Sequence, residues 1–404
     1  MNNFSVLYRY ECKKLLNRKI VRITFALCIA TIMVSLCVPF IGSYYVGGEA
    51  VDTNFNMYQT DKCYSEELSG RAIDQELLEE TIEAYRKIPY TEELPYSLTE
   101  EYQKYARPYS PIFNFIVGTT DMQTSDVIWS WQPSEDDLYE NRKMWLKSEW
   151  EDLGLSQGEM DFWQEKEESL KTPFVYQHHE AYSNLTLCYL TIGLLELLLI
   201  AICLSGVFSE EHTGKTDQII LCSPLGKTQI YWIKLAAGIS FAMVSTILLS
   251  LFSFVMAVCL HGTEGFQAAF QLIYISSSEP VTCGQAMLIM FVCMMFAAIV
   301  TSIFVMVLSE LLHSSIAALS VSAGLLIMAM SISVPEQYRI LSQIWDWLPW
   351  SFLSPWNVFG KYTLSVCGHY FTSWQAVPII YLLAGIVVST AGKPVYQRFQ
   401  VSGR

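Results

Sequence analysis

Residues 184–207, NLTLCYLTIGLLELLLIAICLSGV, form an apolar run that contains one ionisable side chain, Glu196. A helix rises about 1.5 Å per residue, so a run of this length can cross the roughly 30 Å hydrocarbon core of a bilayer. Five further runs of spanning length contain no Asp, Glu, Lys or Arg. The sequence therefore predicts an all-α integral membrane protein with six transmembrane helices. The predicted spans are residues 23–43, 184–207, 235–260, 285–309, 315–334 and 375–392.

Basic residues collect on one side of these spans. Residues 1–22 hold six of them, and the segments 208–234 and 393–404 add more, whereas the opposite loops 261–284 and 335–374 contain only Arg339 and Lys361. Lys and Arg accumulate in cytoplasmic loops. We therefore expect a multi-pass protein of the bacterial cytoplasmic membrane, with both termini and the short turn 310–314 in the cytoplasm. The bases on this side are Arg9, Lys13, Lys14, Arg18, Lys19, Arg22, Lys215, Lys227, Lys234, Lys393, Arg398 and Arg404.

Residues 1–22 mix aromatic and aliphatic side chains with these cations. That mixture is typical of an amphipathic helix that lies at the headgroup surface, and it predicts an interfacial elbow before the first span. An ordinary positive flank of a span explains the bases equally well. Both interpretations stay open on the sequence alone.

Residues 44–183 differ in composition from the rest of the chain, because they carry 29 acidic against 11 basic side chains. Long translocated domains are largely exempt from the charge rule, so this acidic segment is predicted to be extracellular. Apolar residues at helical spacing in Glu66–Lys87 predict a helix there. Further helix starts are predicted at the N-cap Ser134 and at the capping boxes Ser97–Glu100 and Ser156–Glu159. We expect four or so helices around an aromatic core, with residues 107–133 as a loop-rich or strand-containing part.

The external segment 335–374 is apolar and rich in tryptophan, but its prolines make it a poor straight crossing. It is predicted to enter the membrane interface and return. Trp and Tyr favour that interface, so simple anchoring is the favoured interpretation, and a gate at the outer mouth is the alternative. The gate candidates are Trp345, Trp347, Pro349, Trp350 and Pro355.

The cytoplasmic loop 208–234 contains two predicted helix starts. Ser209 precedes Glu210 and Glu211, which suit the positive end of a helix dipole. Ser223–Pro224 pairs a favoured N-cap with a residue pre-organised for the first helical position. The tripeptide that begins at Gly214 matches the end of a phosphate-binding loop, but Ser209 stands where that loop requires its first glycine, so we reject a nucleotide site.

The sequence contains no recognisable catalytic or metal-binding motif. His178–His179–Glu180 lacks the spacing of a zinc motif, and a polar face beside the membrane is the favoured interpretation. The external cysteines Cys63, Cys283 and Cys367 have no motif spacing, so buried structural thiols are the favoured interpretation, and a Cys283–Cys367 bridge stays open. We expect no enzyme activity, no metal and no cofactor bound by this chain, and no nucleic-acid partner.

Glu196 is the remaining anomaly, because a carboxylate in lipid costs on the order of 3 kcal/mol on insertion scales. It is expected to face protein or water. Two interpretations stay open: a group on the translocation path, or a neutral carboxylic acid hydrogen-bonded to a neighbouring span or subunit.

The chain resembles the permease subunits of ABC-2-type ATP-binding-cassette exporters. The resemblance rests on the basic stretch Tyr10–Lys19 before span one and on the large insert after it. It rests also on the loop with Glu210–Glu211, Gly214 and Ser223-Pro-Leu-Gly-Lys227, and on the proline-broken segment before span six. It covers nearly the whole chain outside the acidic insert.

This resemblance implies a half-transporter that pairs with itself or a sibling permease and binds two copies of a cytoplasmic ABC ATPase. ATP and Mg²⁺ would be bound by that ATPase, and an amphipathic peptide or drug-like substrate would move outward. The 209–223 helix would be the coupling helix that contacts the ATPase. The residues assigned to this coupling are Glu210, Glu211, Gly214, Lys215, Ser223, Pro224 and Lys227.

A sensor or immunity protein is the alternative of another class, in which the acidic insert binds cationic peptides. A secondary transporter is disfavoured, because the sequence shows no internal repeat.

Overall fold

A computed structural model describes residues 3–89, 96–120, 122–213 and 229–398 of the chain. The chain divides into two compact units. We call the first, Met1–Met33, Leu187–Val255 and Ile289–Arg404, the membrane unit. We call the second, Val34–Thr186 and Met256–Leu288, the insert unit. Within the described residues the fold is almost entirely helical, with two small β-hairpins.

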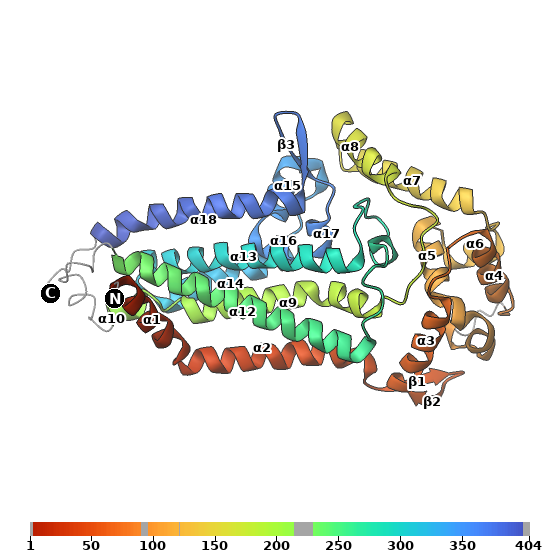
Figure 1. Cartoon of the computed structure of the whole chain (residues 1–404), viewed down its shortest axis with the longest axis horizontal. Helices are drawn as coiled ribbons and strands as arrows, with labels where there is room; N and C mark the ends of the chain where they lie inside the picture. Colours follow the sequence, from red (N-terminus) through yellow and green to blue (C-terminus); the bar gives the residue numbers. More distant parts are fainter. Residues whose placement is uncertain (1–2, 90–95, 121, 214–228, 399–404) are drawn as a thin grey trace. The chain divides into compact units, whose positions relative to one another are not determined.

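Five long helices are apolar enough to cross a membrane, and in Figure 1 their axes run roughly along one direction. Backbone polar groups are satisfied within a helix, which is why apolar runs of this length fold as helices in lipid. They correspond to the predicted spans 23–43, 184–207, 235–260, 285–309 and 375–392, and they confirm a multi-pass membrane protein. The helices are α2 (Lys19–Cys37), α9 (Glu180–Leu204), α12 (Gln229–His261), α13 (Cys283–Leu312) and α18 (Ser373–Arg398).

The predicted span 315–334 corresponds to a shorter helix, α14, which covers Ser315–Ser331. Its 17 residues lie at the lower limit of about 17 to 25 for a membrane-spanning helix. The Ser314 hydroxyl accepts from the amide of Ala317 and caps its start. The count of six spans therefore stays a prediction.

The predicted elbow 1–22 is divided into two helices. Helix α1 covers Asn3–Leu16, and α2 begins at Lys19. The amide of Arg18 donates to the carbonyl of Leu15 in the turn between them (3.2 Å). The first apolar helix thus starts before the predicted residue 23, because its first turn includes Lys19 and Arg22.

Close contacts hold the helices of the membrane unit together. The Tyr189 hydroxyl of α9 donates to the carbonyl of Met290 on α13 (2.8 Å). A Cβ on Gly193 would lie 2.9 Å from the Cβ of Leu353, so α9 approaches that residue closely because glycine has no side chain.

The segment 335–374 is broken into short pieces, as its prolines predict. Pro349 and Pro355 stand at the first positions of their helices, where the missing amide costs no hydrogen bond. A hairpin follows, with Val366 paired to His369 and a tight turn at Cys367–Gly368 in which both φ angles are positive. The pieces are η6 (Glu336–Tyr338), α15 (Arg339–Asp346), α16 (Pro349–Phe352), α17 (Pro355–Val358), β3 (Thr363–Val366) and β4 (His369–Thr372).

The insert unit is mainly helical, as predicted, but its elements differ in two places. The predicted helix Glu66–Lys87 is confirmed over Gln75–Arg86, which form α4, but it is not continuous, because α3 ends at Leu68 and α4 begins only after the N-cap Asp74. Residues 107–133 hold helices α5 and α6 rather than loops or strands. The helices are α3 (Asn54–Leu68), α4 (Gln75–Arg86), α5 (Ser110–Thr120), α6 (Thr124–Trp129), α7 (Glu135–Asp152) and α8 (Gln157–Glu168).

The strands of the insert unit lie before these helices. Strand β1 (Ser43–Val46) pairs antiparallel with β2 (Glu49–Thr53), and Gly47–Gly48 supply the positive φ angles of the turn. Short one-turn helices complete the unit. They are η1 (Val38–Phe40), η2 (Tyr96–Leu98), η3 (Tyr102–Ala106), η4 (Arg107–Tyr109) and η5 (Phe270–Leu272).

The predicted caps are confirmed at two of three positions. The Ser134 hydroxyl accepts from the amide of Asp137, and Ser156 and Glu159 form a capping box. At the third position Thr99 takes the role predicted for Ser97, because its hydroxyl accepts from the amide of Tyr102 (3.2 Å).

The core of the insert unit is aromatic, as predicted. Tyr85 of α4 stacks on Phe113 of α5 with 3.6 Å between ring centroids. Phe174 meets Phe115 and Tyr139 edge to face. Stacked and edge-to-face ring pairs stabilise the folded state by more than the burial of their apolar surface alone.

A buried guanidinium fixes residues 275–277 against α7. Arg142 pairs with Glu167 of α8, and it also donates to the carbonyls of Ile275 (3.0 Å) and Ser277 (2.8 Å). Both members of the pair are almost fully buried. A buried charge that loses its partner is costly, so this site is expected to control the stability of the insert unit.

We predict that Arg142→Met lowers the free energy of unfolding by about 3–5 kcal/mol, because Glu167 would remain as an unpaired buried charge. The measurement is thermal unfolding of the full-length protein in detergent. Lys143→Met on the same helix removes only an exposed pair and is expected to change stability by less than about 1 kcal/mol. Equal effects of the two substitutions would contradict the assignment.

Candidate functional site

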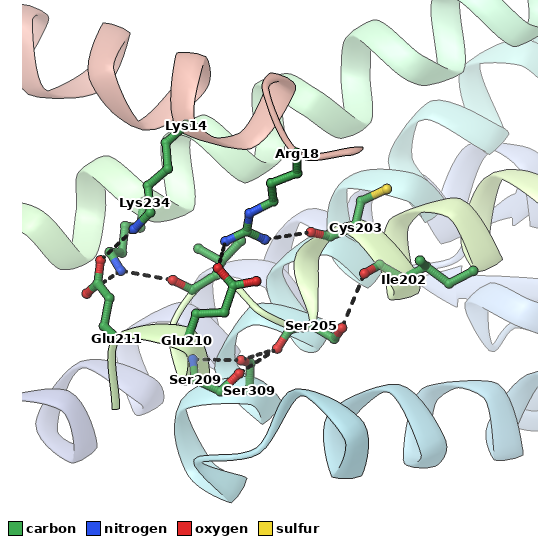
Figure 2. Close-up of polar contacts among 11 residues, drawn as sticks. Lys14, Arg18, Ile202, Cys203, Ser205, Ser209, Glu210, Glu211, Lys234 and Ser309 are labelled. Atoms are coloured by element: carbon green, nitrogen blue, oxygen red, sulfur yellow. Dashed lines mark hydrogen bonds and ion pairs between the residues drawn. The ribbon is translucent and has the colours of Figure 1, made fainter. Parts of the chain in front are cut away.

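A sharp turn joins α9 to the short acidic helix α10, which covers Ser209–Thr213. Figure 2 shows how Ser309 of α13 holds this turn: its hydroxyl donates to the carbonyl of Ser205 and accepts from the amide of Ser209 (3.3 Å). The Ser209 hydroxyl also donates to the carbonyl of Ser205 (3.1 Å). Serine side chains therefore satisfy the carbonyl of Ser205 and the amide of Ser209, two backbone groups at the ends of these helices.

Glu211 of α10 lies between two lysines from different helices (Figure 2). Its Oε1 is 2.9 Å from Nζ of Lys14 on α1, and its Oε2 is 2.6 Å from Nζ of Lys234 on α12. The Lys234 ammonium is fully buried, donates also to the carbonyl of Val207 (2.9 Å) and lies over the Phe208 ring at 4.9 Å. We call Lys14, Glu211 and Lys234 the lysine–glutamate triad.

Glu210 forms a second, more exposed link to the segment after α1. Its Oε2 is 2.5 Å from Nη2 of Arg18, and its side chain is 52% exposed. Nη1 of Arg18 donates to the carbonyl of Cys203 near the end of α9 (3.3 Å). The two neighbouring carboxylates of α10 therefore differ in environment, with Glu211 buried and Glu210 accessible.

The electrostatics of Lys14 reflect its pairing. Burial favours the neutral amine, but the hydrogen bond and the negative charge of Glu211 outweigh burial, and the pKa of Lys14 is raised above its ordinary value. Lys14 thus stays charged throughout the physiological range.

Aromatic side chains pack beside the triad. Phe208, Tyr231 of α12 and Tyr396 of α18 lie with ring centroids 5.6–5.7 Å apart. The Tyr231 hydroxyl donates to the carbonyl of Ser389 (2.6 Å). Side chains of α1, α12, α13 and α18 therefore all reach α10 or the turn before it, so a displacement of α10 acts on each of these helices.

The structure brings together two of the residues assigned to coupling, Glu210 and Glu211. Gly214, Lys215, Ser223, Pro224 and Lys227 lie outside the described residues. The pairing of α10 with Lys14, Arg18 and Lys234 was not predicted from the sequence, although the same bases predicted the orientation of the chain. Adjacent acidic residues on one segment and unpaired bases on another were the available signal.

Glu196 of α9 is fully buried against α12. Its Oε1 accepts from the hydroxyls of Ser245 (2.6 Å) and Thr246 (3.1 Å). Its Oε2 has no hydrogen-bond partner in the described part of the chain. The carboxyl group therefore faces protein, which was one of the two expected surroundings, and it is hydrogen-bonded to a neighbouring span.

The predicted gate residues lie in the short pieces between α14 and α18. The Trp347 indole donates to the hydroxyl of Ser373 (3.1 Å), and its carbonyl accepts from Tyr381 (2.8 Å). Trp345 and Trp350 are half-buried, Pro349 is half-buried and Pro355 is buried. Two hydrogen bonds to α18 therefore fix the position of Trp347.

Of the tripeptide predicted to form a polar face beside the membrane, Glu180 is exposed, but His178 is buried, which corrects the prediction for that residue. Its Nδ1 is 2.9 Å from the Ser65 hydroxyl, its Nε2 is 3.3 Å from the carbonyl of His261, and Ser65 contacts Tyr176 at 2.6 Å. These contacts satisfy a neutral imidazole, and burial lowers the pKa of His178 below its ordinary value. Within the described residues no group of three His, Cys, Asp or Glu is arranged to hold a metal ion.

The two cysteines of the bridge left open by the sequence lie in different units. Cys283 is a buried free thiol, and Cys367 is an exposed free thiol in the turn between β3 and β4.

No protein-family model matches the chain, and no curated protein matches it by sequence.

We predict that Glu211→Gln destabilises the protein by about 3–5 kcal/mol, because the buried Lys234 ammonium would lose its counter-charge. Glu210→Gln breaks a half-exposed pair and is expected to cost about 1 kcal/mol or less. Thermal unfolding of both full-length variants in detergent measures the difference. A Glu211→Gln protein as stable as the Glu210→Gln protein would show that the triad contributes little.

We also predict an acid-sensitive contribution from His178. Its pKa is lower in the folded than in the unfolded state, so its contribution is complete above the ordinary value of about 6.5 and is lost as the pH falls through the folded value. The melting temperature of the wild type should therefore fall more between pH 7.5 and pH 5 than that of His178→Gln. The exposed His369, changed to Gln, is the control and should keep the wild-type slope. Parallel profiles for all three proteins would count against this role.

Proposed function

We propose that this chain is the permease subunit of an ABC-type exporter, which moves an amphipathic peptide or drug-like substrate outward across the cytoplasmic membrane. The energy would come from ATP hydrolysed by a separate cytoplasmic ATPase. One observation carries the proposal: the acidic helix α10 is tied by ion pairs to α1 and α12 while Glu210 stays accessible.

A short helix that receives force must be attached firmly to the spans that move. Separating Glu211 from Lys234 would leave two unpaired charges in a buried site, which is strongly unfavourable. A push on α10 would therefore displace α12 before it broke the triad. Lys14 extends the same attachment to α1.

The accessible carboxylate of Glu210 and the bases near it supply a polar surface for a partner. In the proposed assembly two ATPases, which hold ATP and Mg²⁺, contact the α10 segments of two permeases, either two copies of this chain or this chain and a sibling. This chain supplies the path across the membrane, for which Glu196 is the candidate group, and it holds no nucleotide.

A sensor or immunity protein is the second candidate, and the acidic insert favours it. The excess of acidic side chains in residues 44–183 attracts cationic peptides at low salt. In that function α10 would need no ATPase.

The experiment is affinity purification of the tagged full-length chain from its native membranes in mild detergent. An exporter is expected to retain an ABC ATPase in near-stoichiometric amount. Its absence after chemical cross-linking would contradict the proposal and favour the sensor.

A charge-swapped variant tests the role of α10 itself. Arg18→Glu combined with Glu210→Arg preserves the internal ion pair and reverses the charge presented on α10. Retained ATPase is expected to fall severalfold while the melting temperature stays near that of the wild type. Lys143→Glu on α7 is the matched control and should retain the ATPase. Full retention by the swapped variant would remove Glu210 from the contact.

A further inference from the structure

A groove of about 460 Å³ lies among α1, α2 and α12 in the membrane unit. Most of its lining is apolar, with Phe25 and Ile29 from α2 and Phe241 and Leu248 from α12. Its volume falls within the range of ligand sites in proteins, about 300–1,000 Å³.

The groove is open on the outer surface of the membrane unit. Val244 and Leu248 line it and are 54% and 47% exposed. Of the five candidate spans, α2 and α12 are the least buried, at 22% and 28%. Exposed apolar side chains on a membrane-spanning helix contact lipid, so lipid has direct access to this groove.

The length of the groove matches one leaflet. Its lining on α12 runs from Ala237 to Leu248, roughly 16 Å at about 1.5 Å per residue. Half of a hydrocarbon core of about 30 Å is about 15 Å. An acyl chain of a single leaflet therefore fits along it.

One end of the groove carries a cation. Arg22, in the first turn of α2, lines the groove and donates only to the carbonyl of Asn17 (3.2 Å), and no acidic partner is found for it in the described ranges. The hydroxyls that line the groove are already used, because Tyr8 donates to Ser240 and Ser245 donates to Glu196. The guanidinium of Arg22 is therefore the polar group that can bind a ligand in this groove. Its geometry and charge suit a phosphate, which can accept two parallel hydrogen bonds from it.

We propose that this groove binds one anionic phospholipid, with the phosphate on Arg22 and an acyl chain between α2 and α12. The excess of bases over acids in residues 1–22 adds to the attraction of anionic headgroups. The binding site is independent of whether the chain works with an ATPase.

The test is native mass spectrometry of the full-length protein with added phosphatidylglycerol or phosphatidylcholine. Wild type is expected to retain one phosphatidylglycerol in preference to phosphatidylcholine. Arg22→Gln should lower phosphatidylglycerol retention about fivefold and leave phosphatidylcholine unchanged. Arg9→Gln removes the same charge from exposed α1 outside the groove and should behave as wild type.

A second variant, Ala26→Trp, fills the groove without removing Arg22 and should abolish retention of both lipids. Equal losses in the Arg22→Gln and Arg9→Gln proteins would show diffuse attraction rather than a site. Retention that survives Ala26→Trp would place the lipid elsewhere. A lipid-free dimer of the wild type that dissociates in Ala26→Trp would assign the groove to a second copy of the chain. Each of these three results overturns the proposal.

Discussion

The buried ammonium of Lys234 is the constraint on which the membrane unit depends. An ammonium with no exposed surface is tolerated only if a carboxylate and further hydrogen bonds surround it. Glu211 and the carbonyl of Val207 supply both, which requires the turn after α9 to place α10 against α12. Ser309 then closes that turn from α13, and Lys14 brings α1 to the other oxygen of the same carboxylate. One charge thus explains why α1, α12 and α13 meet at one place.

The membrane-spanning helices were predictable from sequence because the interactions that form them lie within each segment. An apolar run must satisfy its backbone within itself, and residues 184–207 or 285–309 leave no alternative to a helix. Errors arose where local signals compete. The chain breaks after Leu68, and Asp74 caps the start of the next helix. The apolar spacing continues through both helices of Glu66–Lys87, so it did not indicate this break. In residues 107–133, prolines that suggested loops instead stand in the first turns of η4 and α5.

The site was predictable only in part, because its partners are distant in sequence. Glu210 and Glu211 were recognisable as a helix start, yet Lys14 lies 197 positions from Glu211. Nothing local indicates which base a carboxylate selects. Glu196 shows the same limit. Its position within a span predicted that it faces protein or water, but its bonds to the hydroxyls of Ser245 and Thr246 form only when α9 packs on α12. The sequence did not reveal that His178 is buried, because its partners Ser65 and His261 are distant along the chain.

The two carboxylates of α10 differ in exposure, so its two ion pairs differ in their sensitivity to salt. Glu210 is half-exposed and Glu211 is buried. At physiological ionic strength the Debye length is about 8 Å, and dissolved ions screen the half-exposed Arg18–Glu210 pair much more than the buried Lys234–Glu211 pair. Salt therefore weakens the outer pair more than the buried one. The outer contact of helix α10 is therefore the weaker one in salt, and the inner pair with Lys234 is the contact that holds α10 to α12.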